Sequence, residues 1–406
     1  MRTRTPALAT LAAAAIVVAP AVPATAAGGT DPAVTITTQA TTITVSGHGW
    51  GHGHGMSQYG AQGAARAGLS YSQIMAFYYP GTALGSFTGK VRVLITDDAD
   101  NNTTVRPTSG LRLTDTGRGK TWTLPTSKHP KAWRLRIKDG KRQVLYRTGT
   151  WHRYHPGGHA TLKGDGQFSS SSGPVTLRLP SGDVRYRGAL RLSNRDTVNV
   201  VGMEKYLRGV VPSEMPASWK PEALKAQAVA ARSYAAFERA DNAGRYFQVY
   251  DTTRSQVYDG YDAEVPATND AIAATASQIV TYAGKPAFTQ FSSSSGGWTS
   301  AGGQPYLVAK QDIYDKPVDP VAHIGDPNFS WGPTPLKLAP LRNAYPGTLT
   351  SVQITLRETP NTAGTGHVKT VVLHGTGPSD VTLTGSQFQS LYNLKSNYFS
   401  LSATTP

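Results

Sequence analysis

The 406-residue sequence contains no cysteine. Disulfide bonds and cysteine-ligated metal sites are therefore excluded, and ordinary core packing must hold the fold together. The apolar run near the N-terminus is too short to span a bilayer comfortably, and no later segment is apolar enough to do so. Glutamate is also scarce. The chain has six glutamates, and all of them lie at or beyond residue 204. The chain thus offers few glutamates for acid catalysis.

The first residues predict a secretory signal peptide. Arg2 and Arg4 precede the apolar run "ALATLAAAAIVVAPAV", and the small-residue pattern "PATAA" indicates cleavage near Ala27. A retained N-terminal anchor is the alternative. Removing the two arginines takes the formal net charge from +15 to +13, which favours binding to polyanions. We expect a secreted, cell-wall-associated protein that binds anionic wall polymers and no nucleic acid, because the sequence has no recognised nucleic-acid-binding motif.

The remaining pattern predicts an α+β fold, mainly β, with one long central helix. Short runs rich in β-branched and aromatic residues, separated by Gly, Pro, Asp and Ser, indicate strands from Val91 to about Val200. The segment "PASWKPEALKAQAVAARSYAAFERA" has helical apolar spacing, with Ser218 as N-cap and Pro221 in the first turn. We expect a signal peptide at 1–27, a Gly/His segment at 28–90 that packs with the C-terminal part, a β-rich region at 91–185, and a core with C-terminal strands at 186–406.

Glu214 is the best-placed candidate for acid catalysis. It lies in "VVPSEMP", between Pro212 and Pro216, where prolines stiffen a loop and fix the direction of a side chain. Its neighbours Val211 and Met215 are apolar, and an apolar setting raises a carboxyl pKa toward the range that a general acid needs at neutral pH. From these residues alone, a plain surface-loop carboxylate remains the competing interpretation.

The stretch "GHGWGHGHGMSQYG" at residues 47–60 allows three interpretations. His48, His52 and His54 are all even-numbered, so an extended chain would point them the same way, as a metal site requires. No Asp or Glu lies nearby, which argues against a metal. A phosphate-binding loop would need a lysine and a following helix in the Walker pattern, and the stretch has neither. The third interpretation is the wall of a substrate groove.

The sequence "YRGALRLSNRDTVNVVGMEKYLRGVVPSEMPASWKPEALKAQAVAARSYA" closely resembles the catalytic core of the SpoIID/LytB family, which comprises the sporulation stage II protein D and the related amidase enhancer. The segments "DTTRSQVYDG", "AIAATASQIVTYAGKPAFTQFSSSSGGWT" and "YLVAKQDIYD" are similar to the family blocks that follow, in the same order. Together the blocks cover well over half of the mature chain. The Gly/His stretch at residues 47–60 also resembles a family signature, which favours its interpretation as the wall of a substrate groove.

The resemblance implies a lytic transglycosylase of peptidoglycan in which Glu214 is the catalytic acid. A glycosidic bond breaks through an oxocarbenium-like transition state, and the leaving oxygen needs a proton. Hydrolases usually pair this acid with a second carboxylate. In a lytic transglycosylase the C6 hydroxyl of muramic acid attacks instead of water, so one carboxylate can serve as acid and then as base. A chain poor in glutamate suits that chemistry.

The resemblance also implies a set of substrate-binding residues. On the predicted helix, Lys225 and Arg232 are seven residues apart and share one face, although a solvated charge is the competing interpretation for Lys225. The full set is Lys225, Gln227, Arg232, Ser293, Ser294, Ser295, Gly296, Gly297, His52, His54, Ser57 and Gln58. Some family members bind zinc near the block matching "DTTRSQVYDG". Here Arg254 and Ser255 cannot hold zinc, so we expect no metal and no cofactor.

Two functions compete at this point. The first is an exported peptidoglycan lytic transglycosylase that cleaves glycan strands with one glutamate as acid and base. The second is a wall-binding amidase-enhancer protein that stimulates a cell-wall amidase without catalysis of its own. A metal-dependent wall amidase is weaker than either, because no complete set of metal ligands is visible.

The order of the segments differs from the usual order in the family. There the Gly/His signature follows the catalytic core, directly after a segment resembling "LTGSQFQSLYNLKSNYFSL". Here that segment closes the chain and the signature opens it, as in a circular permutation. Permutation is tolerated when the old termini lie close together at the surface. We therefore expect the strand at 41–46 to lie beside the strand at 398–402, which would carry residues 48–58 toward Glu214.

Overall fold

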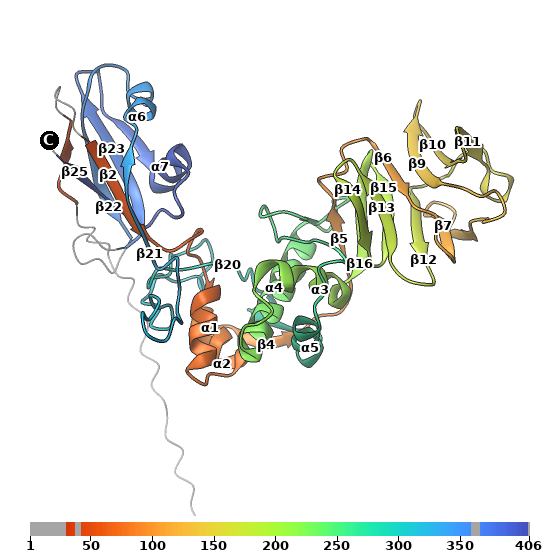
Figure 1. Ribbon diagram of the computed structural model, residues 1–406, viewed down its shortest axis with the longest axis horizontal. Coiled ribbons are helices and arrows are strands. Elements are labelled where there is room, and N and C mark those ends of the chain that lie inside the picture. The colour runs from red at the N-terminus through yellow and green to blue at the C-terminus, as the bar shows by residue number, and fades with distance from the viewer. Residues whose placement is uncertain (1–29, 37–41, 359–365, 405–406) are drawn as a thin grey trace, which may run out of the picture.

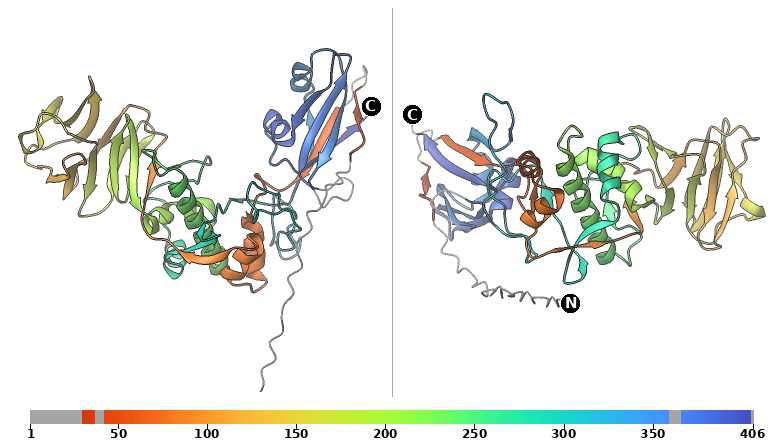
Figure 2. Two further views of the ribbon diagram at one scale, coloured as in Figure 1. Left: turned by 180° about the vertical axis from the view of Figure 1, so that it is seen from behind. Right: turned by 90° about the horizontal axis from the view of Figure 1, so that it is seen from below.

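The computed structural model describes residues 30–36, 42–358 and 366–404. The expected signal peptide lies outside the described residues. Three parts follow one another along the molecule: a β lobe at one end, a helical centre, and a C-terminal lobe at the other end (Figure 1). The views from behind and from below show the same order (Figure 2). Among the described residues, no helix is long and apolar enough to cross a membrane.

The β lobe contains most of two sheets, which are antiparallel except where β17 pairs in parallel with β5. A seven-stranded sheet has the order β17-β5-β16-β15-β12-β7-β8, and a six-stranded sheet has the order β11-β10-β9-β6-β13-β14. The strands are β5 Lys90–Leu94, β6 Asn102–Val105, β7 Leu111–Asp115, β8 Lys120–Thr123, β9 Ala132–Lys138, β10 Lys141–Arg147, β11 Trp151–Tyr154, β12 Gly166–Ser170, β13 Val175–Leu179, β14 Gly182–Tyr186, β15 Ala189–Ser193, β16 Asp196–Gly202 and β17 Val249–Tyr250, with a short 3-10 helix at Pro156–Gly158.

One hydrophobic core joins the two sheets to the helices that follow them. Phe168 and Val144 of the sheets belong to the same buried cluster as Tyr206 of α3 (Met203–Glu214) and Ala231 of α4 (Pro221–Asp241). The expected domain boundary at 185/186 falls at the last residue of β14, and this core continues across it. The β lobe and the start of the helical centre are therefore packed as one body.

In the helical centre, α4 packs against four other helices and β18. Its buried alanines permit this close approach, because a methyl group adds little width to the helix. The other elements are α1 Gln58–Arg66, α2 Tyr71–Tyr78, α5 Pro266–Ala274, β3 Met56–Ser57, β4 Ala83–Ser86, β18 Gln278–Tyr282, β19 Lys285–Pro286 and β20 Phe291–Ser292.

The expected fold class is confirmed in part. Strand predominates over helix, as predicted. The long helix is present with Pro221 as its first residue, but Lys220 and not Ser218 occupies the N-cap position. The described residues form seven α-helices, so the picture of one long central helix was incomplete. The shorter helices of the helical centre pack against α4, which stabilises them.

The C-terminal lobe brings an early strand and the last described strand together in one sheet. Strand β2 (Thr42–His48) lies between β21 (Ser330–Leu336) and β25 (Phe399–Thr404), with Thr44 opposite Ser402 and Ser46 opposite Ser400. The expected neighbourhood of these two strands is thus confirmed. The other elements are β1 Val34–Thr35, β22 Leu349–Arg357, β23 Val368–Gly375, β24 Val381–Thr384, α6 Ala339–Ala344 and α7 Gly385–Tyr392.

Candidate active site

Glu214 is the last residue of α3 and not a loop residue, which corrects the expectation from the sequence. Pro212 lies inside the helix, and Met215 adopts an extended conformation (φ −140°, ψ 135°). The residue before a proline is pushed out of the helical region, so Pro216 ends the helix directly after Glu214. The carboxylate is therefore held at a helix end, where its backbone is fixed by the helix.

The surroundings of Glu214 favour its protonated form. Burial raises the pKa of this carboxyl, and the charge of Asp259 adds to the rise. Hydrogen bonds from the Val257 amide and the Gln58 side chain act in the opposite direction and lower the pKa. The Val257 amide lies 2.7 Å from Glu214 Oε1. The net direction is upward, as a general acid requires.

Glu214 opens onto a cavity of about 330 Å³. Its walls come from the Gly/His segment with the start of α1, from α3 and α4, and from the loops at 253–255 and 290–293. The lining residues are Trp50, Gly51, His52, Gln58, Glu214, Tyr234, Thr253, Arg254, Ser255, Gln290, Phe291, Ser292 and Ser293. Glu214 is the one carboxylate among these described residues.

The Gly/His segment follows an alternating backbone path rather than an extended one. Gly49, Gly51, Gly53 and Gly55 all have positive φ, between +68° and +109°. At Gly55, a Cβ atom would lie 2.2 Å from the Gln290 carbonyl oxygen. Glycine is thus required both for the conformation and for the close approach to the loop at 290–296. The glycines fix this segment against the cavity instead of leaving it loose.

This path separates the three histidines. His48 points away from the cavity, with Nδ1 3.1 Å from the Phe329 carbonyl and its ring 4.9 Å from that of Tyr398. His52 lines the cavity, and its Nδ1 accepts a hydrogen bond from the His54 amide.

His52 and its neighbour His54 both favour the neutral form. Desolvation lowers the pKa of His52, although part of its ring stays exposed, and the neighbouring charge of His54 lowers it further. Desolvation likewise lowers the pKa of His54, with Lys369 contributing. Neutral imidazoles donate and accept hydrogen bonds without adding charge. The three histidines were expected to point the same way, and this is wrong because His48 points away from the cavity. No group of three metal-ligating side chains occurs among the described residues.

Gln58 links the Gly/His segment to the long helix. Its Nε2 lies 3.4 Å from Oε1 of Gln227, which is fully buried behind it. The Nε2 atom of Gln227 has no hydrogen-bond partner within the part of the chain that is described. Gln227, expected to bind substrate, instead holds Gln58 beside Glu214.

The serine–glycine loop turns most of its polar groups away from the cavity. Ser294 and Ser295 donate hydrogen bonds to buried carboxylates of Asp315, Asp326 and Asp312. Gly296 donates its amide to Asp315, and Gly297 bends the chain with φ +92°. Ser57 Oγ also donates to Asp315, at 2.9 Å, and caps α1 by accepting the Gly60 amide. Within the expected serine set, Ser293 alone lines the cavity.

Lys225 and Arg232 do not reach the cavity, which contradicts the substrate contacts expected of them. Lys225 Nζ lies 2.7 Å from Glu222, one turn earlier on α4. Arg232 is fully buried, pairs with Glu204 at 2.7 Å, and donates to the Gln278 carbonyl. Arg232 therefore ties α4 to α3 and β18, and this requirement explains an arginine inside an alanine-rich helix.

The structure adds cavity residues that the sequence reasoning missed. Tyr234 lies on α4, seven residues after Gln227 and so on the same helix face, a spacing that would have identified it. The guanidinium of Arg254 lies 3.9 Å from the centre of the Tyr250 ring. Arg254 also lines the cavity and is the one Lys or Arg among the lining residues. No spacing rule pointed to Arg254, because its position depends on a loop.

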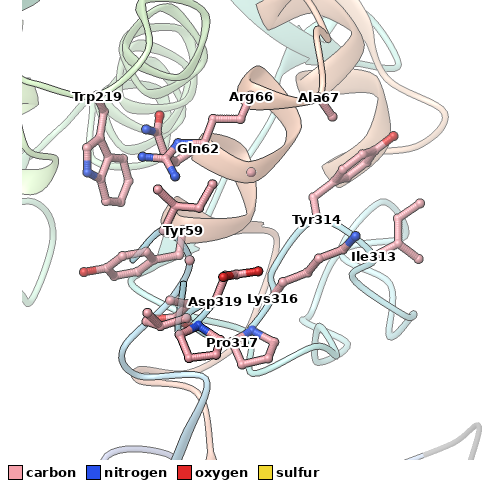
Figure 3. A pocket seen from close by; sticks show the side chains of 16 residues that line it. Tyr59, Gln62, Arg66, Ala67, Trp219, Ile313, Tyr314, Lys316, Pro317 and Asp319 are labelled. Atoms are coloured by element: carbon pink, nitrogen blue, oxygen red, sulfur yellow. The ribbon is translucent and has the colours of Figure 1, made fainter. Parts of the chain in front are cut away.

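A second hollow of about 700 Å³ begins at Tyr59, the residue after Gln58 (Figure 3). The rings of Tyr59 and Trp219 lie 4.9 Å apart at its edge, and Arg66 and Lys316 line it as well. Trp219 follows Glu214 by five residues, and the Tyr59 amide donates to the Ser293 carbonyl. The two hollows thus flank the same start of α1.

The segment that contains Glu214 is similar to known proteins. Residues 192–282, which include Glu214, match the family model for stage II sporulation protein, SpoIID. The chain is 44% identical over 115 residues to the amidase enhancer of Bacillus subtilis (strain 168), covering 27% of this chain and 15% of that protein. It is 36% identical over 149 residues to stage II sporulation protein D of the same organism, covering 31% of this chain and 43% of that protein.

An uncharacterised protein of Brachyspira hyodysenteriae (strain ATCC 49526 / WA1) is 40% identical over 131 residues, covering 31% of this chain and 36% of that protein. The chain therefore spans less than half the length of each of these three relatives.

Proposed function

Residues 192–282 belong to the SpoIID family, and from this premise we propose that the protein acts on the bacterial cell wall as a lytic transglycosylase of peptidoglycan glycan strands. One observation carries the proposal: a carboxyl with a raised pKa, Glu214, opens onto a cavity whose other lining residues carry no carboxylate. We propose further that the protein is secreted and remains associated with the wall.

The proposed reaction needs one carboxyl group that acts twice. Protonated Glu214 gives its proton to the glycosidic oxygen as the bond from C1 of muramic acid breaks, through an oxocarbenium-like transition state. The resulting carboxylate then takes the proton of the C6 hydroxyl of the same sugar while that oxygen bonds to C1. The product is a 1,6-anhydro sugar, and Glu214 regains its proton. The Val257 amide and Gln58 hold the carboxylate between the two steps.

The cavity offers suitable contacts for a glycan. Trp50 lines the cavity, is 49% exposed, and provides an aromatic surface for a sugar ring. Arg254 supplies a guanidinium for the lactyl carboxylate of muramic acid. The Tyr59–Trp219 pair gives a second aromatic surface for the strand beyond the scissile bond.

The substitution Glu214→Gln tests the proposal, because it keeps the shape of the side chain and removes the proton donor. Cleavage of purified glycan strands should fall by about 10²-fold or more, with an unchanged fold by circular dichroism. Glu222→Gln, outside the cavity, is the control and should retain activity. Mass spectrometry should show products ending in 1,6-anhydro-muramic acid. Reducing ends would instead establish hydrolysis and refute the transglycosylase reaction.

An amidase-enhancing role is the second candidate, because a relative 44% identical over 115 residues carries the name amidase enhancer. In that case the protein would bind the wall and raise the rate of a wall amidase without cutting glycan. The same assay separates the two. Absence of any glycan cleavage, together with stimulation of an amidase that survives Glu214→Gln, would establish the second function.

A further inference from the structure

The positive charge of the chain is concentrated in one part of the β lobe. Residues 101–187 contain 17 of the 40 Lys and Arg residues but only 4 of the 25 Asp and Glu residues. The rest of the chain is nearly balanced, with 23 basic and 21 acidic residues. The surplus therefore belongs to this part, which contains β6 to β14 and lies at the end of the molecule away from the C-terminal lobe (Figure 1).

The two faces of the six-stranded sheet carry different kinds of side chain, apolar on one and basic on the other. Val105, Leu135, Val144 and Leu177 are buried in the hydrophobic core. Because successive residues of a strand point to opposite faces, their chain neighbours lie on the outer face. We define the basic face as this outer surface of β9, β10, β11 and β13, which carries Arg134, Arg136, Lys141, Arg147, Arg153 and Arg178.

Strand register brings these cations together. Arg134 lies opposite Leu145 of β10, and Leu145 lies opposite Arg153 of β11. Lys141 lies opposite Lys138, a like-charged neighbour. Burial lowers the pKa of the Arg134 guanidinium and Asp100 raises it, while the charges of Arg136, Arg147 and Arg178 lower it. These guanidinium groups are therefore close enough to repel one another, an arrangement that costs stability without an anion.

Few carboxylates offset this repulsion. Within residues 101–187, all of which the structure describes, Arg136, Arg147 and Arg178 form no ion pair. Asp183 lies opposite Arg178 in the register, but its ion pair is with Arg106. Arg134 has a distant one with Asp100, at 3.9 Å. The guanidinium of Arg134 lies 4.2 Å from the centre of the Trp151 ring, a cation–π contact that restricts its position. Carbonyl and amide oxygens orient other members, such as Arg136 on Gln143.

We propose that the basic face binds a linear phosphodiester polymer of the cell wall and so anchors the protein there. Five of its six members are arginines, whose planar guanidinium groups match phosphate oxygens better than an ammonium does. A row of cations on a rigid sheet suits a repeating anion more than a single small ligand. The inference is independent of Glu214, which lies outside this sheet.

Two other polyanions fit less well. A membrane surface would be expected to take up exposed apolar side chains, and all the large exposed ones in the described residues lie outside 101–187. A single-stranded nucleic acid would require free aromatic faces for base stacking, whereas Trp151 is covered by Arg134. Both remain outcomes of the test.

The test measures binding of the full chain to isolated cell walls that carry a polyol-phosphate polymer, before and after hydrofluoric acid removes that polymer. The triple variant Arg136→Glu, Arg147→Glu, Arg178→Glu should bind intact walls about tenfold more weakly or worse, with a reduced dependence on salt. Removal of the polymer should weaken binding of the parent chain to the same extent. The control triple Arg112→Glu, Arg195→Glu, Arg342→Glu makes the same charge change outside the basic face and should bind within about twofold of the parent.

Cleavage of soluble glycan should be unchanged in both triples, so failure of this proposal and failure of the proposed catalysis are distinguishable. If the triple glutamate variant does not fold, the triple variant Arg136→Gln, Arg147→Gln, Arg178→Gln takes its place in the binding assay. Undiminished binding to stripped walls, or wild-type binding by the triple variant, would overturn the proposal. Tighter binding to DNA or to anionic lipid vesicles than to the phosphodiester polymer would also overturn it.

Discussion

Glu214 must be protonated to act first as an acid, so its titration should limit activity at high pH. Burial raises its pKa, whereas the hydrogen bond from Gln58 lowers it. We predict that kcat/KM on purified glycan falls as pH rises through the raised pKa. Gln58→Leu removes the hydrogen bond that favours the carboxylate, so the falling limb should move to higher pH while kcat decreases.

The pH profiles of the parent chain and of Gln58→Leu provide the measurement, with Gln73→Leu as a control outside the cavity. An unshifted limb with a simple loss of activity would mean that Gln58 does not control the protonation of Glu214. A rising limb in place of the falling one would mean that the first catalytic step uses the carboxylate.

At the scale of single residues, the sequence identified Glu214 as the candidate acid. It also placed Lys225 and Arg232 in the site, but neither residue lines the cavity. A spacing of seven residues correctly put Lys225 and Arg232 on the same side of a helix, but spacing does not say what that side faces. The answer depends on Glu204 and Glu222, which attract the two cations. Gln227, which was expected to bind substrate, is fully buried and contacts Gln58 instead of lining the cavity.

The Gly/His segment depends on glycine for two separate reasons, which two substitutions can separate. Gly68→Ala imposes backbone strain alone, since its φ is +90° and nothing lies within 4 Å of the added Cβ. We expect it to cost about 1–2 kcal/mol of unfolding free energy. Gly55→Ala adds a clash with the Gln290 carbonyl, so its cost should be larger and glycan cleavage should be lost. Urea unfolding and the glycan assay measure both effects, and equal costs would contradict the close packing at Gly55.

The buried carboxylates under the serine–glycine loop should make stability depend on pH. Burial and the neighbouring Asp315 raise the pKa of Asp326 to about 7, far above its ordinary value. A carboxyl whose folded pKa is raised contributes stability at low pH, and this contribution is lost as pH rises from about 4 to about 7. We predict that Asp326→Asn flattens the fall in melting temperature between about pH 5 and 8.

Asp319→Asn is the matched control, because backbone amides of Ala322 and Val321 lower the pKa of Asp319. Its titration lies below that interval, so the slope between about pH 5 and 8 should remain as in the parent chain. If Asp326→Asn leaves the slope unchanged, the buried carboxyl does not take up a proton on folding.

Among the elements, the long helix had the strongest local signal, and Pro221 lies in its first turn as predicted. Helices α1 and α2 also carry a local signal, because both begin at serine caps and Ser70 forms a capping box with Gln73. Two elements needed tertiary information. The segment ending in Glu214 looked like a proline-bounded loop, but packing against α4 and α5 extends α3 through Pro212. The alternation of Gly and His suggested a strand, whereas close contact with the loop at 290–296 imposes positive φ at every second residue.

At the scale of the whole molecule, the sequence indicated the proximity of the chain ends but not the continuity of the core. The order of family-like segments led to the pairing of β2 with β25, because joined segments in a permuted chain must stay adjacent. The division at 185/186 followed the start of the family-like segment at Tyr186. A match of that kind does not reveal that Phe168 on one side and Tyr206 on the other share a single buried cluster.

The pairing of β2 with β25 allows a direct test of the permutation. Thr404 and Thr42 lie opposite each other at the ends of two antiparallel strands, so a two-residue Asn-Gly turn can join them as a hairpin. The chain can then be reopened between Thr88 and Gly89, two exposed residues between β4 and β5. This rearrangement places the Gly/His segment after the catalytic core.

We predict that a chain running 89–404, Asn-Gly, 42–88 folds and cleaves glycan at a rate within about threefold of a linear 42–404 control, because every contact around Glu214 is retained. The linear control carries the same residues and therefore also lacks β1 and the pair between Asp31 and Arg357. Circular dichroism and urea unfolding should give matching curves for the two chains. A permuted chain that is unfolded while the linear control folds would show that the present order of segments is required, and that the segment did not move by simple permutation.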